Sequence, residues 1–270
     1  MNAEAQAGTS DHATAAELNT RLSELILRIA ISQSIVGSAL EIPKSFDVVQ
    51  ERSFESHRSG QSGILDILLE GKIIKEVSSK DEFDPFLKAL ALQTTVNAEM
   101  VISAAVIVLS HSTTDDVFTA ACQIAIDLAP KEWISELNLK RTVSLEVLRE
   151  KGADRIFTDE LRSYRDRIAG KSLPTRADLL FSHVPIILHS GIPREDAAYF
   201  RTSKVKEMDE LRHDIVHAEA LQRVRLKDGT EAALFLHEAA QTALRSLARR
   251  FSLTPQQQVL FKGLAQKEKV

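Results

Sequence analysis

A long apolar segment, residues 86–110, constrains the fold of this chain more than any other feature. Its length and nearly continuous apolar character fit a helix that is buried on most sides. β-branched and aromatic residues at a spacing of two are scarce, and aromatic residues make up only 5% of the chain, so strands are disfavoured. The sequence therefore predicts an all-α fold with this segment as the central helix.

Other segments have apolar residues at helical spacing and stop signals between them. A long first helix is expected over residues 15–40. Thr113 or Thr114 is expected to cap a new helix that follows the central one and ends before Pro130. The remaining expected helices cover residues 140–152, 154–168, a short stretch ending at 183, a stretch that starts at 202 or 203, and 231–251. Residues 221–229, with their Asp-Gly pair, are expected to form a turn.

The chain has 270 residues, 44% of them hydrophobic, which is enough for a full core. Residues 1–14 are expected to be a flexible N-terminus, and residues 15–80 a helical extension with a connection rich in serine and glycine. Residues 81–253 are expected to form the main helical bundle, and residues 254–270 a C-terminal tail. This organisation predicts one bundle domain with an N-terminal helical extension.

Composition limits where the protein can be located and which class of protein it can belong to. The first 16 residues have neither a positively charged start nor an apolar signal core, and polar residues interrupt the most apolar stretch, 91–109. The single cysteine, Cys122, excludes an internal disulfide and is expected to be a buried, unreactive thiol. We therefore expect a cytoplasmic protein without a membrane anchor. Its net charge of −4 argues against a general nucleic-acid-binding protein, because such proteins usually have a basic surface.

The residues that most suggest chemistry are the six from 212 to 217, Arg-His-Asp-Ile-Val-His. A guanidinium can hold a phosphate through two hydrogen bonds, and an imidazole can move protons near neutral pH. At 100° per residue, an apolar face is expected to contain Val205, Met208, Leu211, Ile215 and Ala218. The opposite face is expected to contain Lys206, Asp209, Glu210, His213 and His217, with Arg212 at its margin. The two histidines are therefore predicted to lie on a solvent-facing side.

Two features of this helix suggest that a second copy covers it. Val216 places an apolar group beside the polar face, and Arg212 and His217 diverge by about 140° on an ideal helix. A two-fold axis that brings up a second helix would cover Val216 and place an arginine near a histidine.

At this point the chain resembles the HEPN domains, which are all-α bundles that include many metal-independent endoribonucleases working as dimers. The likeness rests on Arg212-polar-x-x-x-His217 in a late helix and on Leu-Arg-His-Asp-Ile-Val-His, which is similar to bacterial HEPN proteins of the RNase-toxin-like kind. A looser similarity covers residues 108–116 together with Cys122, Pro130 and Trp133. The resemblance spans about residues 85–250, and it implies a HEPN-like bundle.

The resemblance also implies roles for the residues. Arg212 would bind the scissile phosphate, His217 would act as general base or acid, and His213 would support one of them. The products would carry 2′,3′-cyclic phosphate and 5′-hydroxyl ends, without a metal or another cofactor. The implied partners are an RNA substrate, a second copy of the chain, and an antitoxin or regulatory protein, as in toxin–antitoxin or phage-defence systems.

The same signature occurs at two other places. Arg52 with His57 lies in the serine- and glycine-rich connection, and Arg176 with His183 spans only a short helix. His111 and Asp115, one turn apart, are also candidates to line the site, although a structural hydrogen bond is the favoured role for this histidine.

Three other functions stay open. One is a non-catalytic HEPN module that dimerises or binds RNA or a nucleotide. A second is a zinc hydrolase that uses His213 and His217 as ligands, with His237 or Glu238 downstream. The third is a metal phosphohydrolase built on His213-Asp214, with His183 or His189 upstream.

Overall fold

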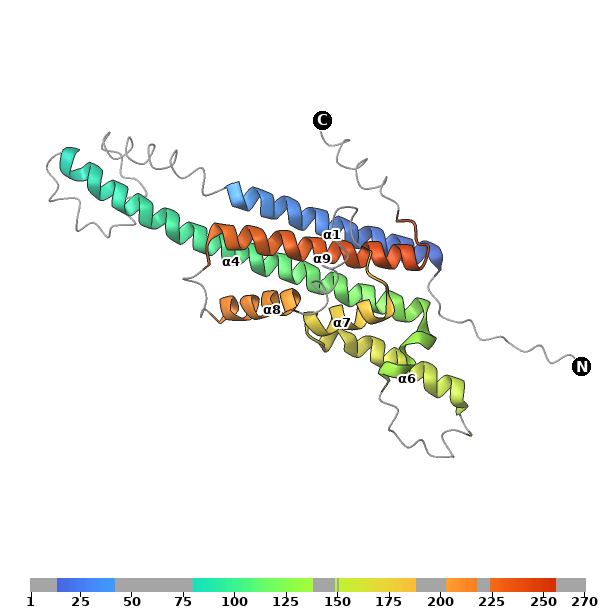
Figure 1. Cartoon of the computed structure of the whole chain (residues 1–270). Coiled ribbons are helices and arrows are strands. Elements are labelled where there is room, and N and C mark those ends of the chain that lie inside the picture. Colours follow the sequence, from blue (N-terminus) through green and yellow to red (C-terminus); the bar gives the residue numbers. More distant parts are fainter. Residues whose placement is uncertain are drawn as a thin grey trace, which may run out of the picture. The chain divides into compact units, whose positions relative to one another are not determined.

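The computed structural model describes residues 14–41, 80–137, 149, 151–187, 203–217 and 224–255, and over residues 80–95 it describes the backbone alone. Of this part of the chain 88% is helical and none is strand, which confirms the predicted all-α class. The elements are α1 (Ala15–Glu41), α4 (Lys80–Leu128), the 3-10 helix η3 (Pro130–Glu136), α6 (Ala153–Arg167), the 3-10 helix η4 (Ile168–Gly170), α7 (Leu173–His183), α8 (Ser203–Val216) and α9 (Leu226–Arg250) (Figure 1). Predictions for residues 1–13, 42–79, 138–148, 150, 188–202, 218–223 and 256–270 fall outside the described residues.

The chain divides into two compact units. The first consists of Met1–Ile31, His111–Glu210 and Leu236–Val270, and the second of Ser32–Ser110 and Leu211–Phe235. Four helices, α1, α4, α8 and α9, contribute residues to both units.

The first unit is built around the C-terminal part of α4. In Figure 1, α1 and α9 lie on one side of this part of α4, and α6 and α7 lie on the other. α1 buries Leu18, Leu22, Leu25 and Ile29, whose spacing of three or four places them on one helix face. From α4, Phe118 is fully buried and meets Phe181 of α7 edge to face, with the ring centroids 5.7 Å apart. Each aliphatic side chain buried in this way stabilises the fold by about 1.5–3 kcal/mol.

The turn after α4 contains the largest fully buried side chain. Pro130 has no N–H to continue the helix and begins η3, which places Trp133 in the core. The indole of Trp133 stacks on the imidazole of His183, with centroids 4.2 Å apart, and lies near the Tyr164 ring of α6. η3, α6 and α7 are therefore packed around one aromatic cluster.

α4 differs from the prediction because it continues without a break from Lys80 to Leu128. The polar residues at 110–116 suggested a helix end and a new cap at Thr113 or Thr114. In the structure Thr114 does not cap a helix, because its hydroxyl donates to the Leu236 carbonyl oxygen of α9 at 3.0 Å. Four side chains of this stretch bind neighbouring helices rather than their own backbone, so they do not interrupt α4: His111, Thr114, Asp115 and Asp116.

α9 also begins earlier than predicted, at Leu226 rather than near Glu231. The Asp-Gly pair lies in its first turn instead of in a separate turn. Asp228 accepts a hydrogen bond from the backbone N–H of Arg225 at 2.8 Å, which stabilises the start of the helix. Gly229 lies directly against Ser103 of α4, so that a Cβ there would be 3.0 Å from both Cα and Cβ of Ser103.

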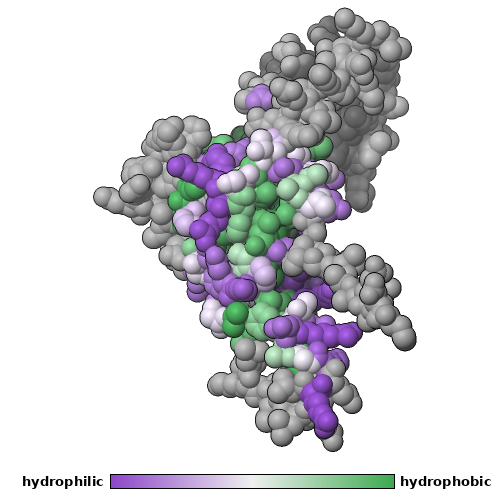
Figure 2. Space-filling view, turned by 90° about the vertical axis from the view of Figure 1, so that its right-hand side faces the viewer, coloured by the Kyte–Doolittle hydropathy of each residue, from purple (hydrophilic) through white to green (hydrophobic). Residues whose placement is uncertain are grey.

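The second unit has a small apolar core. Val36, Val106 and Ala233 are its buried members, and four partly buried residues pack against them: Ala39, Leu40, Ile102 and Leu109. Among the described residues of the whole chain, the large apolar side chains left exposed are Ile31, Ile35, Val101, Ile134, Val216 and Leu234. Figure 2 shows one face, on which apolar residues are visible in the middle and hydrophilic residues border them. Exposed apolar groups of this kind are available for contact with a partner.

Two helices, α1 and the part Val96–Leu128 of α4, are long and apolar enough to span a membrane by length and composition alone. Core helices of soluble proteins meet the same criterion. In the first unit two ion pairs join these helices. Arg21 of α1 pairs with Asp127 of α4, and Arg28 of α1 pairs with Asp116 of α4. The cytoplasmic location stays a prediction.

The tight contact at Gly229 predicts opposite effects for two glycine substitutions in the second unit. Gly229→Val would force α9 away from Ser103 and destabilise the fold by about 1–3 kcal/mol. Gly37→Ala lies on an exposed part of α1 where a Cβ meets no atom within 4 Å, so it should stabilise by about 0.5–1 kcal/mol. Urea unfolding of both variants measures the difference. Equal effects of the two substitutions would show that the helices do not approach closely at Gly229.

Candidate active site

The helix that holds the six candidate residues, α8, packs as its sequence pattern predicts. Val205, Met208 and Ile215 are all buried, with at most 7% of each residue exposed. Leu211 is partly buried, and Ala218 lies outside the described residues. The opposite side is solvent-facing, with Lys206, Glu210, His213 and His217 exposed. The predicted core face is therefore confirmed for the members that the structure describes.

His213 and His217 lie next to each other on the exposed side of α8. Their ring centroids are 4.3 Å apart, and the ring planes are inclined by 52°. His217 lies one residue beyond the end of α8, but its backbone N–H still donates to the carbonyl oxygen of His213 at 3.0 Å. The helical turn therefore extends through His217 and holds both imidazoles on one side.

Arg212 is partly buried at the margin of this exposed side. Neither its guanidinium nor the two imidazoles form an ion pair or side-chain hydrogen bond with any residue in the described part of the chain. No described residue therefore competes with an external ligand for these three groups. A free guanidinium suits phosphate, and free imidazoles suit proton transfer.

Two neighbours complete this end of α8. Asp214 is partly buried, and Val216 is 51% exposed. An apolar side chain this exposed beside two histidines is the feature that suggested a covering partner in the sequence.

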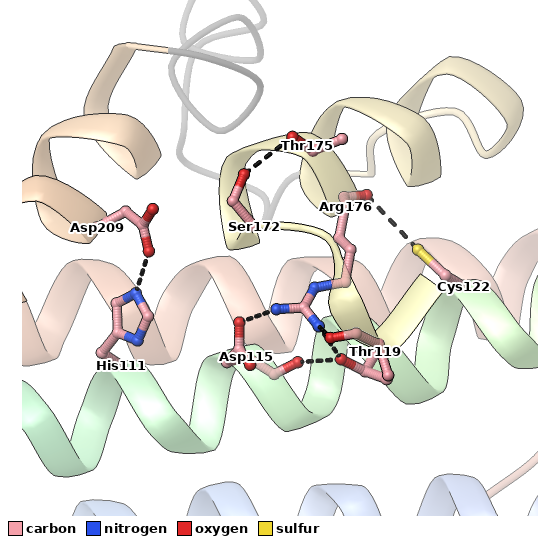
Figure 3. A network of polar contacts seen from close by, with 9 residues as sticks. His111, Asp115, Thr119, Cys122, Ser172, Thr175, Arg176 and Asp209 are labelled. Carbon is pink, nitrogen blue, oxygen red and sulfur yellow. Dashed lines mark hydrogen bonds and ion pairs between the residues drawn. The ribbon is translucent and has the colours of Figure 1, made fainter. Parts of the chain in front are cut away.

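A different histidine, His111 of α4, has a carboxylate partner that the sequence did not reveal. Its Nε2 lies 2.8 Å from Oδ1 of Asp209, which belongs to the part of α8 in the first unit (Figure 3). His111 is 5% exposed, so the hydrogen bond that joins α4 to α8 comes from a buried imidazole. His111 therefore has the structural hydrogen bond that was its favoured role, and Asp115 has a different partner, Arg176. The sequence pattern placed Asp209 on the solvent-facing side of α8, but in the structure its side chain is partly buried against His111.

Asp115 binds Arg176 of α7, whose guanidinium is buried (Figure 3). The same guanidinium donates to the Thr119 hydroxyl at 2.6 Å and to the carbonyl oxygen of Ala169 at 3.1 Å. The arginine is therefore neutralised and hydrogen-bonded within the first unit.

This arrangement distinguishes two copies of the Arg–His signature. In the copy at residues 176 and 183, Arg176 is occupied by Asp115, and His183 stacks on Trp133 and lies 3.3 Å from Oε1 of Glu136. In the copy at 212 and 217, Arg212 is partly exposed and His217 is exposed. Arg212 and His217 are therefore the better candidates, while Arg176 and His183 have structural roles. The third copy, Arg52 with His57, lies outside the described residues.

Two further reactive residues are buried. Cys122 is fully buried as predicted, and burial raises the pKa of its thiol to about 12. Its Sγ donates weakly to the Arg176 carbonyl oxygen at 3.5 Å (Figure 3), and it stays protonated and unreactive at neutral pH. His237 is 4% exposed, and burial lowers its pKa, so it is neutral near pH 7.

The described residues do not include three or more His, Cys, Asp or Glu side chains grouped closely enough to hold a metal ion. His213 and His217 are thus two potential ligands without a described third. A zinc hydrolase usually needs three protein ligands, and a phosphohydrolase site needs a comparable set.

Comparison with known proteins identifies no relative. No family model, no curated protein and no solved structure matches this chain. The resemblance to HEPN proteins therefore rests on the residues quoted above.

The environment of Arg176 predicts unequal effects for two adjacent aspartates. Asp115→Ala would leave a buried guanidinium without its counter-charge and should destabilise the protein by about 3 kcal/mol. Asp116→Ala breaks only the exposed pair with Arg28, in which both side chains are about 60% exposed, and should cost less than about 1 kcal/mol. Chemical unfolding of the two variants measures the difference.

Arg176→Met provides the matched test of this explanation. It removes the buried charge and leaves Asp115 partly solvated, so it should destabilise less than Asp115→Ala does. A larger loss for Arg176→Met would mean that packing of the arginine stem, rather than its charge, dominates.

Proposed function

We propose that this protein is a metal-independent endoribonuclease that cleaves RNA by attack of the ribose 2′-hydroxyl on the adjacent phosphate. The observation that supports this proposal best is the pair of neighbouring, exposed imidazoles on α8, beside the guanidinium of Arg212. Within the described residues none of the three groups forms an ion pair. This set supplies two proton-transfer groups and one phosphate-binding group.

The chemistry needs no group beyond these three. One neutral imidazole takes the proton of the 2′-hydroxyl, and the resulting oxygen attacks phosphorus. The bond from phosphorus to the 5′-oxygen breaks, and this oxygen receives a proton from an imidazolium. The products are a 2′,3′-cyclic phosphate and a 5′-hydroxyl.

Each residue has a definite role in this scheme. Arg212 binds the scissile phosphate and stabilises the negative charge that develops on its oxygens. His217 is the principal general base or acid. His213, whose ring lies beside that of His217, serves as the complementary proton-transfer group or as its support.

We further propose that the complete site forms between two copies of the chain. Arg212 and His217 lie about 140° apart around an ideal helix, so one phosphate does not easily reach both from the same helix. A second α8 related by a two-fold axis would supply the missing group and would cover Val216, which is 51% exposed. The proposed partners are thus RNA and a second copy, with an antitoxin or regulatory protein in a toxin or phage-defence setting in the cytoplasm.

The proposal predicts RNA cleavage by the purified full-length chain in excess chelator. His217→Ala should reduce the rate by about 10²–10⁴-fold because a positioned proton-transfer group is lost. Arg212→Ala should reduce it by about 10²–10³-fold. Arg155→Ala, an exposed arginine of α6, should leave the rate unchanged. Analysis of product ends should find cyclic phosphates, and RNA binding without any cleavage would indicate a non-catalytic module instead.

A composite site predicts that two inactive variants complement each other. In a mixed dimer of Arg212→Ala and His217→Ala chains, one of the two sites has both of its residues intact. Random mixing should therefore restore about a quarter of the wild-type rate. Each variant alone, at the same total concentration, is the control. If the mixture stays as inactive as its components, then both residues of a site come from one chain.

A further inference from the structure

The imidazoles of His213 and His217 have the spacing along the helix that suits a pair of metal ligands. The residues lie one helical turn apart, and their ring centroids are separated by 4.3 Å. Both are exposed, so an ion can reach them without any movement of the backbone. Among the described residues neither ring has a hydrogen-bonding or ionic partner that would compete for its nitrogens.

The coordination chemistry of imidazole selects the class of ion. Neutral imidazole binds Zn²⁺, Ni²⁺ and Cu²⁺, and a Zn–N bond is about 2.0–2.1 Å long. Two rings on successive turns can hold one ion through small side-chain rotations. Once the first ring has bound the ion, the second binds intramolecularly, so two ligands on one helix can exceed the affinity of a single imidazole by on the order of 10²-fold.

The described surroundings leave such a site open. They supply no third protein ligand close enough to complete a closed set. The remaining coordination positions would be filled by water or by the histidines of a second copy. An ion held in this way is exchangeable and sensitive to chelators.

We propose that His213 and His217 form a bidentate site for a divalent transition-metal ion such as Zn²⁺, and that occupation of this site inhibits the protein. The inhibitory part rests on the ribonuclease function proposed above, whereas the binding part does not. The ion would be a regulator rather than a cofactor.

Inhibition follows from competition for one lone pair. A ring nitrogen that coordinates Zn²⁺ has no lone pair left to accept a proton, so it cannot act as a general base. The same coordination withdraws the imidazolium that would protonate the leaving 5′-oxygen. One ion would thereby remove both proton-transfer groups of α8 at once.

Calorimetric titration of Zn²⁺ into the full-length, metal-free protein tests the site directly. Wild type should bind the ion, and either His213→Ala or His217→Ala should weaken binding by on the order of 10²-fold. Wild-type binding no tighter than that of the double alanine variant would overturn the proposal.

A relocated ligand separates metal binding from loss of a structural histidine. Glu210 is exposed, pairs only loosely with Lys206 at 3.6 Å, and lies three residues before His213 on the same side of α8. Adding Glu210→His to the His217→Ala variant rebuilds a pair of imidazoles on successive turns and should restore tight Zn²⁺ binding. If it does not, the pair of rings is not the binding element.

The inhibitory role is tested by adding Zn²⁺ to the RNA cleavage assay. Cleavage should fall in parallel with the occupancy measured by calorimetry and return when chelator is added. Undiminished cleavage at full occupancy overturns inhibition while binding stands. Absence of cleavage in chelator overturns the ribonuclease function, and the inhibitory role with it, whereas the calorimetric result still decides the metal site.

Discussion

The arrangement of helices in the first unit depends on the buried guanidinium of Arg176, which needs a counter-charge and hydrogen-bond acceptors. A charge in a protein interior must be neutralised and hydrogen-bonded, and Asp115 of α4 meets that need. The same stretch of α4 supplies His111 to α8 and Thr114 to α9. A typical hydrogen bond adds only about 1 kcal/mol net, but a buried polar group left unpaired costs more. These contacts therefore fix which helix lies where, while the apolar core provides most of the stabilisation.

The chain contains the same Arg–His pattern in two environments with opposite consequences. Arg176 pairs with Asp115, and His183 contacts the Trp133 ring and the carboxylate of Glu136. Both side chains are therefore held in place and cannot act on a ligand. Within the described residues Arg212 and His217 have no such partners, and Arg212 is partly and His217 fully exposed on α8 and its end. Both pairs consist of the same residue types. What separates the structural pair from the candidate catalytic pair is whether their polar groups are already bound by other side chains.

Availability of the imidazole nitrogens also connects the two proposals made for α8. A ring that is exposed and free of partners can accept a proton, and the same lone pair can bind a transition-metal ion. In the two proposals, proton transfer and metal binding therefore compete for the same nitrogens of His213 and His217.

The sequence by itself determined the all-α class, the extent of α1 and α6, the buried face of α8 and the burial of Cys122. These features depend on helical periodicity, which is a local property of the chain. The tertiary structure decided the continuity of α4, the early start of α9 and the pairing of His111 with Asp209. The polar run after residue 110 and the Asp-Gly pair are common helix breakers in isolation. They remain helical here because distant segments supply their hydrogen-bonding partners and close contacts, and no local pattern specifies which distant segment will lie beside them.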